Sequence, residues 1–270
     1  MEKEYKIVGI LNTTPDSYFD GGKYLDVDSA LVRIEEMIEE GVDIIDIGGE
    51  STGPGSKEVS ANEESDRVIP IIKACKDKYP NLEISIDTYK SSVAQEAIDV
   101  GATIVNDVTA GRGDKNMFNT IAKNKVPIVL MYSKDNSPRT TIKENEYEDV
   151  INTIIEFLKS RIDVARTAGI PYDQIIIDPG MGHFVSSNPK YSFEIIARLK
   201  ELKDALKLPI LVSPSRKSFL SGKNNLPPSE RLPETIAASC ISVLNGAEFI
   251  RTHDVKEVGR GCAVASNTAA

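Results

Sequence analysis

The sequence has few of the residues that build disulfide frameworks or zinc sites. Its 270 residues include only three cysteines and two histidines. The cysteines, Cys75, Cys240 and Cys262, lack the spacing of metal ligands, and two of them lie in apolar helical segments. We therefore predict buried, reduced thiols and no structural zinc site.

Long apolar runs are also lacking, and none of those present could cross a bilayer. The first residues, MEKEYKIVGIL, include acidic side chains and no small-residue cleavage site of a signal peptide. Both absences favour a cytosolic protein without membrane association. A net charge of −9 argues against nucleic acid as a partner, because such binding depends on neutralising phosphates. An anionic substrate remains compatible with this charge, since an acidic protein can contain a local cationic pocket.

Short β-rich apolar runs alternate with longer helical patterns along the chain, which predicts parallel strands joined by helical crossovers. The expected strands are residues 5–11, 42–47, 83–86, 104–106, 127–131, 174–177, 209–212 and 249–251. The expected helices are residues 27–40, 64–78, 91–100, 115–124, 144–168, 191–206 and 233–245. Glycines follow four of the helices, where a left-handed residue turns the chain back: Gly41, Gly101, Gly169 and Gly246.

Eight such units predict an α/β fold of the TIM (β/α)8-barrel type, with residues 1–270 forming a single domain. A doubly wound sheet is disfavoured because no GxGxxG pattern follows Leu11. The last segment, VGRGCAVASNTAA, is expected to be a poor helix that frays, because two glycines interrupt it.

Polar and chemically versatile side chains follow nearly every expected strand, where barrel enzymes carry their active sites. These residues are Asn12, Glu50, Asp87, Asn106, Asp107, Met131, Asp178, Arg216, Lys217, Arg251 and His253. Any one of them alone could be a cap or a loop-stabilising residue. Their joint placement predicts an active site at one end of the barrel.

The expected site has two chemical halves. Carboxylates, an amide and an ammonium suit the edge of a planar heterocycle; these are Asp87, Asn106, Asp178 and Lys217. Met131 either offers a polarizable surface to that ring or is ordinary core. Asn12, Arg251 and His253 form a cationic or metal-tolerant group suited to an anionic leaving group. The two halves together indicate cleavage of a phosphate ester or anhydride.

Seven segments occur in order along the chain: GILNTTPDSYFDGG, DIIDIGGEST, SIDTYK, VNDV, IIDPGMG, SRKSF and RTHDVKE. Together they resemble the dihydropteroate synthase family, and the match runs from Ile7 to about Lys256. The resemblance implies a transferase of folate biosynthesis that joins 6-hydroxymethyl-7,8-dihydropterin diphosphate to p-aminobenzoate and releases diphosphate. It also implies a homodimer.

The resemblance implies residue roles as well. Asp87, Asn106, Met131, Asp178 and Lys217 would bind the pterin. The p-aminobenzoate would lie near Ser218 and two mobile loops, one carrying Thr52 and Pro54 and the other running from Pro15 to Phe19. Asn12, Arg251 and His253 would bind diphosphate, with Mg²⁺ near Asn12. The catalytic residues would be Asp87, Lys217, Arg251 and His253. The pterin C–O bond would ionise before the arylamine attacks.

The sequence departs from the family pattern in three loops. Gly53 stands where the family has Arg after EST, so one contact is missing unless Lys57 or Arg112 replaces it. GHFVSS replaces a GFGK-like run, and His183 either packs against the pterin or points to solvent. MYSKDNSP replaces an MHMQG-like loop. These changes concern affinity and loop behaviour more than the type of reaction.

Two other functions are compatible with parts of the pattern. A pterin-dependent methyltransferase has a similar barrel and acidic pterin pocket but no diphosphate to hold; SRKSF, RTHD and Asn12 favour the synthase. A catalytically idle pterin-binding relative is the second alternative, prompted by Gly53.

Overall fold

The computed structural model describes residues 4–14 and 26–269. Eight parallel strands form the inner wall of a barrel, in the order β6-β5-β4-β3-β2-β1-β8-β7. Their bounds are β1 Lys6–Asn12, β2 Ile44–Gly48, β3 Glu83–Asp87, β4 Ile104–Asp107, β5 Ile128–Met131, β6 Ile175–Asp178, β7 Leu211–Val212 and β8 Phe249–Thr252. A parallel bridge from Ile177 to Ile210 joins β6 to the β7 segment and closes the ring. The predicted TIM-barrel fold is confirmed.

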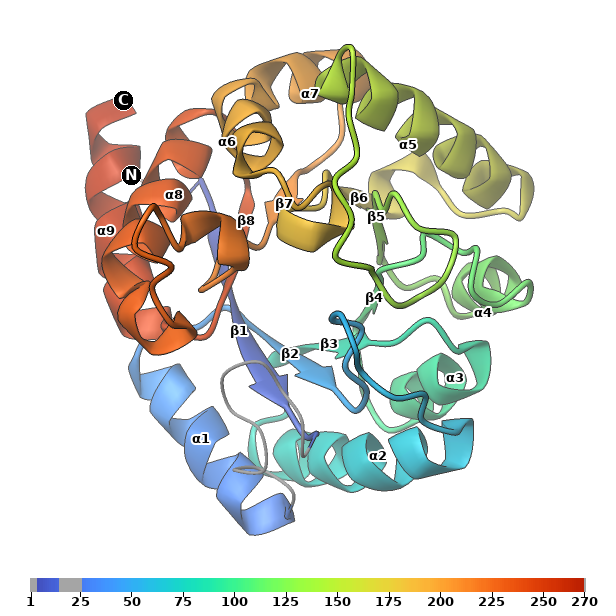
Figure 1. The fold of residues 1–270 in the computed structure, drawn as a ribbon. Helices are drawn as coiled ribbons and strands as arrows, with labels where there is room; N and C mark the ends of the chain where they lie inside the picture. Colours follow the sequence, from blue (N-terminus) through green and yellow to red (C-terminus); the bar gives the residue numbers. More distant parts are fainter. Residues whose placement is uncertain (1–3, 15–25, 270) are drawn as a thin grey trace.

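Helices surround the strands as an outer ring (Figure 1). They are α1 Val27–Glu39, α2 Ala61–Lys78, α3 Ser91–Asp99, α4 Met117–Asn124, α5 Val150–Thr167, α6 Pro189–Ala197, α7 Leu199–Leu206, α8 Leu232–Leu244 and α9 Val255–Ala269. Short 3-10 turns lie at η1 Tyr172–Gln174, η2 Gly182–Phe184, η3 Ser218–Leu220 and η4 Pro228–Glu230. The four glycines expected to turn the chain back all have positive φ, from 91° at Gly41 to 115° at Gly101.

Two predicted helices differ from the structure by more than a few residues at one end or by a break. The helix expected over 144–168 begins only at Val150, because the Asp149 carboxylate accepts from the N–H groups of Ile151 and Asn152 and caps the first turn. The helix expected over 191–206 is two helices that meet at Arg198, whose backbone leaves the α-helical region at φ −112° and ψ 18°.

The prediction of a poor C-terminal helix is wrong, because α9 is a 15-residue helix. It packs against α8, and Gly261 is the reason that it can. A Cβ atom on Gly261 would lie 2.8 Å from Cγ2 of Ile236 and 3.0 Å from Sγ of Cys240. Gly261 therefore lets two helices approach closely, and this packing outweighs the low helix propensity of glycine.

The barrel interior holds two layers of side chains. The lower layer is largely apolar and contains Val8, Ile44, Ile104, Val129, Ile176 and Leu211, with Phe249 packed against it. Ser85 of β3 is opposite Ile104 in this layer. Because side chains alternate along a strand, the residues two positions further on also point inward. This upper layer is Ile10, Asp46, Asn106, Met131, Asp178, Ser213 and Arg251. Asp87 joins it, since β3 pairs with β4 so that Asp87 is opposite Asn106. The polar layer is thus confined to one end of the barrel.

Cys75 and Cys262 are buried as predicted, whereas Cys240 is half-buried; all three are free cysteines. Among the residues that the structure describes, no helix combines the length and the apolar character that crossing a membrane requires.

Candidate active site

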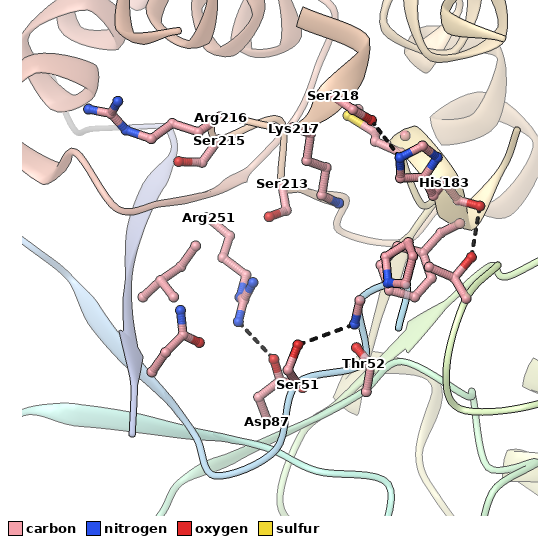
Figure 2. Close-up of a pocket in the computed structure, with 18 of the residues that line it drawn as sticks. Ser51, Thr52, Asp87, His183, Ser213, Ser215, Arg216, Lys217, Ser218 and Arg251 are labelled. Atoms are coloured by element: carbon pink, nitrogen blue, oxygen red, sulfur yellow. Dashed lines mark hydrogen bonds and ion pairs between the residues drawn. The ribbon is translucent and has the colours of Figure 1, made fainter. Parts of the chain in front are cut away.

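A cavity opens at the carboxyl ends of the strands, above the polar layer (Figure 2). It brings together most of the residues predicted for the site: Asn12, Thr52, Pro54, Asp87, Lys217, Ser218, Arg251 and His253. Asn106, Met131 and Asp178 are buried in the upper layer, each with 5% or less of its surface exposed. Phe19, and the loop from Pro15 that contains it, lie outside the described residues.

Arg251 bridges two carboxylates inside the barrel. Its Nε donates to Oδ2 of Asp46 at 2.5 Å and its Nη2 donates to Oδ2 of Asp87 at 2.7 Å. Burial raises the pKa of the Asp87 carboxyl to about 7, although Arg251 acts in the opposite direction. The same surroundings raise the pKa of Arg251, chiefly through Asp46 and Asp87, so the guanidinium stays charged.

Asp46 was not among the predicted site residues. Its side chain is 1% exposed, and its Oδ2 also accepts from Nδ2 of Asn106 at 3.2 Å. This contact leaves Oδ1 of Asn106 as the amide atom that can accept from a ligand. The signal was present in the sequence, because Asp46 lies two residues after the inward-facing Ile44 on one strand.

Lys217 and Asp178 form a second pair of charges beside the first. Burial lowers the pKa of Lys217 to about 8, and burial raises the pKa of Asp178; each group partly offsets the shift of the other. The Asp178 carboxylate is fixed by the N–H of Gly180, which donates to Oδ1 at 2.7 Å. The Lys217 ammonium lies 5.4 Å from the ring centroid of Phe184. Figure 2 shows Lys217 extending into the cavity from the strand-seven side.

His253 lies at the β8 end of the cavity, and both nitrogens of its ring have polar neighbours among the described residues. Its Nδ1 is 2.9 Å from Oγ of Ser215, and its Nε2 is 3.5 Å from Nδ2 of Asn12. Burial lowers the pKa of His253 to about 3, helped by Arg251 and other cations. The imidazole is therefore neutral at physiological pH and acts as a hydrogen-bonding group, not a cation.

Two strand-end residues are structural. Arg216 points away from the cavity in Figure 2, and its guanidinium forms an ion pair with Asp254 at 2.6 Å. Asp107 accepts from the N–H groups of Thr109 and Gly111 and organises its own loop. Arg216 and Asp107 therefore stabilise their loops, which is the alternative role that the sequence left open for each strand-end residue.

The loop after β2 is held by a buried ionic network. The Glu50 carboxylate, 2% exposed, pairs with the Lys90 ammonium and the Arg139 guanidinium, and Lys90 also pairs with Glu64. The loop is further joined to the one after β5, where the N–H of Thr140 donates to the carbonyl of Thr52 at 3.1 Å. One wall of the cavity is therefore fixed by contacts between two loops.

Comparison with known proteins agrees with this geometry. The family model for pterin binding enzymes matches residues 8–253. A dihydropteroate synthase of Clostridium beijerinckii is 43% identical, with 96% of this chain and 92% of that protein covered. The chain belongs to the dihydropteroate synthase family of pterin-binding enzymes.

Solved structures support the same assignment. The Yersinia pestis dihydropteroate synthase in a sulfonamide drug complex has a TM-score of 0.93 at 36% identity, covering 98% of this chain and 94% of that one. The Xanthomonas albilineans dihydropteroate synthase with 4-aminobenzoic acid has a TM-score of 0.89 at 34% identity, with 98% and 93% covered. Family membership makes the chain a transferase and sets aside the methyltransferase alternative.

The departures from the dihydropteroate synthase pattern can now be located. Neither Lys57 nor Arg112, the expected substitutes for the arginine absent at Gly53, lies among the described residues that line the cavity. Arg112 instead donates to Oδ1 of Asn136 and to the carbonyl of Ser133. Arg139, from the β5 loop, contacts Glu50 and the carbonyl of Lys57, which lie on either side of Gly53 in the sequence.

His183 lines the cavity and is half-buried, which excludes the solvent-pointing alternative. Its Nε2 lies 3.1 Å from Oγ of Ser218. The replacement loop also has a role here, because Lys134 of the MYSKDNSP segment donates to the carbonyl of His183 at 2.5 Å.

Proposed function

We propose that this barrel condenses 6-hydroxymethyl-7,8-dihydropterin diphosphate with p-aminobenzoate, giving 7,8-dihydropteroate and diphosphate. The observation that carries the proposal is one cavity flanked by two kinds of group. Asp87 and Lys217 line the cavity, and the Asp178 carboxylate is buried in the layer below it. Beside them lie the charged guanidinium of Arg251 and the neutral imidazole of His253.

The upper layer of the barrel suits the pterin. The edge of a pterin ring carries N–H donors and a carbonyl, which match the Asp178 carboxylate, Oδ1 of Asn106 and the Lys217 ammonium. Met131 is buried in the same layer and would pack against the ring.

The β8 side of the cavity suits diphosphate. Arg251 uses two of its five N–H donors on Asp46 and Asp87, and the guanidinium geometry matches phosphate oxygens. His253 offers a neutral ring nitrogen. Asn12 ends β1 at the same place, with its Nδ2 toward His253 and its Oδ1 available as a hard oxygen ligand.

This donor set fits Mg²⁺ that arrives with the substrate. Mg²⁺ prefers oxygen ligands and is often held by one or two protein groups together with substrate phosphates. In the described part of the chain no cluster of three His, Cys, Asp or Glu could hold a metal by itself. Mg²⁺ held by Asn12 and diphosphate would neutralise charge on the leaving group.

The residues favour a reaction that begins with departure of diphosphate. The pterin C–O bond breaks with its electron pair leaving on the diphosphate oxygen, where Arg251 stabilises the new negative charge. Asp87 stabilises the resulting pterin cation. The amine of p-aminobenzoate then forms the C–N bond and loses a proton. Water would compete for the cation, so the wall around Thr52 and Pro54 also serves to exclude it.

Release of diphosphate on mixing pterin diphosphate with p-aminobenzoate and Mg²⁺ tests the proposed reaction. We expect one diphosphate per dihydropteroate formed. Binding of the pterin without any product would instead indicate a catalytically idle relative, and turnover of methyltetrahydrofolate would revive the methyltransferase.

Alanine variants test the two halves separately. Lys217→Ala and Asp178→Ala should weaken pterin binding by roughly 10- to 100-fold, because each removes a charged hydrogen-bond partner. Arg251→Ala should instead slow diphosphate release at saturating substrate. Calorimetry with a pterin checks the first expectation, and unchanged affinity in both variants would contradict the pterin assignment.

A cytosolic homodimer completes the proposal. Exposed apolar side chains on α8 and α9 support the dimer, namely Ile241 and Leu244 at 48% exposed and Val264 at 67%. Exposed large apolar side chains on two neighbouring helices are a common feature of association surfaces. Sedimentation of the parent and of Val264→Glu would test it, with a shift to monomer expected for the variant.

A further inference from the structure

The main chain of His253 is held on both sides of the residue. Its N–H donates to Oγ of Ser215 at 3.2 Å, and its carbonyl accepts from Nη2 of Arg33 at 3.1 Å. Ser215 lines the cavity beside His253, whereas Arg33 lies on α1, 220 positions earlier in the chain. Arg33 also lies outside the seven segments that carry the family resemblance. The turn between β8 and α9 is therefore anchored to a helix from the other end of the sequence.

The guanidinium of Arg33 is fixed by the carboxylate at the end of its own helix. Its Nη1 donates to Oε1 of Glu40 at 3.2 Å, and its Nη2 donates to Oε2 of the same carboxylate at 3.4 Å. Its Nη1 also donates to Oε2 of Glu36 at 3.0 Å. Two parallel bonds fix the plane of a guanidinium as well as its position. Glu40 thus directs Nη2 toward the carbonyl of His253.

An ion pair on the surface of a helix would explain only part of this arrangement. Such pairs are exposed to solvent and contribute little to stability. The side chains of Arg33 and Glu40 are 16% and 24% exposed, whereas that of Glu36 is 55% exposed. The bond to the carbonyl of His253 also crosses from α1 to the turn after β8. Arg33 is therefore a half-buried link between two elements of the barrel.

Close packing keeps α1 at a fixed distance from this turn. A Cβ atom on Gly9 of β1 would lie 2.8 Å from Sδ of Met37, in α1, and 3.2 Å from Cγ2 of Val255, the first residue of α9. Both helices therefore contact β1 at one point, and Figure 1 shows α1 beside α9 in the outer ring. We expect loss of the Arg33 side chain to remove its hydrogen bonds without moving the helix.

The direction of the imidazole depends on how this turn is placed. The Nδ1 atom of His253 is 2.9 Å from Oγ of Ser215, and its Nε2 is 3.5 Å from Nδ2 of Asn12. Asn12 and His253 line the side of the cavity that we propose for diphosphate. A misplacement of about 1 Å in a site can lower a rate on the order of 100-fold. A fixed peptide at His253 therefore matters for the departure of diphosphate.

We propose that Arg33 is a positioning residue for diphosphate: from α1 it holds the carbonyl of His253 and thereby keeps the imidazole directed at the leaving group. This inference rests on the proposed condensation, because it concerns the group that departs in that reaction. Arg33 is not among the described residues that line the cavity, so it acts through His253 and does not touch the substrate.

A small set of variants separates the geometry of Arg33 from its charge. Arg33→Ala removes the side chain, whereas Arg33→Lys keeps the charge but lacks the planar fork that binds Glu40. Glu36→Gln is the matched control, because it changes the exposed partner of Arg33 and leaves the bonds to Glu40 and His253 in place. Calorimetry with inorganic diphosphate and Mg²⁺, and separately with a pterin, measures the two halves of the site.

We expect Arg33→Ala to weaken binding of diphosphate with Mg²⁺ about 10-fold and to lower kcat by a similar factor, because a hydrogen bond from a charged donor is lost. Arg33→Lys should show a similar loss, whereas Glu36→Gln should bind diphosphate like the parent. Pterin affinity should stay near parental in all three, which a general loosening of the fold would not allow. Parental diphosphate affinity in Arg33→Ala or Arg33→Lys, or an equal fall in pterin affinity, would overturn the proposal.

A double variant shows whether Arg33 acts through His253. Adding Arg33→Ala to His253→Ala should change diphosphate affinity less than about twofold, because changes that act on the same contact are not additive. A full 10-fold further loss would mean that Arg33 acts independently of His253, against the proposal. Thermal unfolding checks that each variant folds; if Arg33→Ala does not, Arg33→Lys takes its place in both comparisons.

Binding of inorganic diphosphate requires no turnover, so this test is separate from that of the reaction. If the parent releases no diphosphate from pterin diphosphate but the variants keep the expected order of affinities, the proposed condensation fails while the role of Arg33 stands. If the parent turns over and that order is absent, the role of Arg33 fails alone.

Discussion

Arg251 is shared between Asp46 and Asp87 at the centre of the polar layer, so charge there is coupled to pH. Burial raises the pKa of Asp87 to about 7 and lowers that of Lys217 to about 8. Asp87 is ionised above its pKa, whereas Lys217 is protonated below its own. The form with both charges therefore predominates only between these values.

We accordingly expect kcat/KM for the pterin substrate to be bell-shaped in pH, with its maximum between about 7 and 8. The acidic limb reports protonation of Asp87 and the basic limb deprotonation of Lys217. Rates measured from pH 5 to 10 check this, and Lys217→Arg should move the basic limb beyond the range because a guanidinium stays charged. A flat profile would contradict the expectation.

Asp46→Asn should move the acidic limb to lower pH. The Asp46 carboxylate is one of the charges that raise the pKa of Asp87, so its neutralisation lowers that pKa, on the order of one unit. The amide keeps the shape of the side chain and can still accept from Arg251. The pH profile is the measurement, with thermal unfolding as a check on folding; an acidic limb that does not move would show that Asp46 has no electrostatic part in the site.

At the scale of elements, helix packing decides more than local propensity. Gly259 and Gly261 lie in the same helix, α9, but in different surroundings. A Cβ on Gly259 would have Ile7 at 3.8 Å as its neighbour, whereas one on Gly261 would meet Ile236 at 2.8 Å. Alanine substitutions at the two positions therefore distinguish the effect of helix propensity on stability from the effect of crowding between α8 and α9.

Gly259→Ala should stabilise the protein by about 0.5–1 kcal/mol, the gain in helix propensity. Gly261→Ala gains the same propensity but overpacks the contact between α8 and α9, which costs about 1–3 kcal/mol. The free energy of unfolding in urea should therefore be lower for Gly261→Ala than for Gly259→Ala by about 1–3 kcal/mol. Equal stability of the two variants would mean that the helices separate without cost.

The elements also show what sequence patterns could and could not predict. All eight strands were predictable because each is a short run rich in apolar residues, and nearly every one is followed by a polar residue. The start of α5 was not, since the helical pattern continues upstream of the Asp149 cap. The order of α9 was missed because Gly261 has its effect only through α8, a contact that no local pattern contains.

The same distinction applies to the site. Residues directly after strands were found, whereas Asp46 was missed because it lies within a strand and is revealed only by counting inward positions. Arg216 and Lys217 are adjacent in sequence, yet only Lys217 extends into the cavity in Figure 2. Their difference follows from the ion pair of Arg216 with Asp254, which depends on how β8 lies beside β7.

Over the whole molecule, the barrel is least continuous between β6 and β7. Strand β7 has two residues, and in the described part of the chain its segment joins β6 through the bridge from Ile177 to Ile210. Asp178 ends β6, and Lys217 follows β7 on the opposite side of this join. The two sides of the join thus carry opposite charges: Asp178 is buried in the polar layer, and Lys217 lines the cavity above it.

A bound pterin would therefore connect the two sides of the barrel at this join. By contacting Asp178 and Lys217 together, it would tie the two sides where the chain's own ladder is thinnest. Amide protons of β6 and β7 should exchange more slowly with deuterium once a pterin is present, and more so than those of β2 and β3, which share a long ladder. In this protein, the small molecule that the enzyme consumes would also finish building the wall that surrounds it.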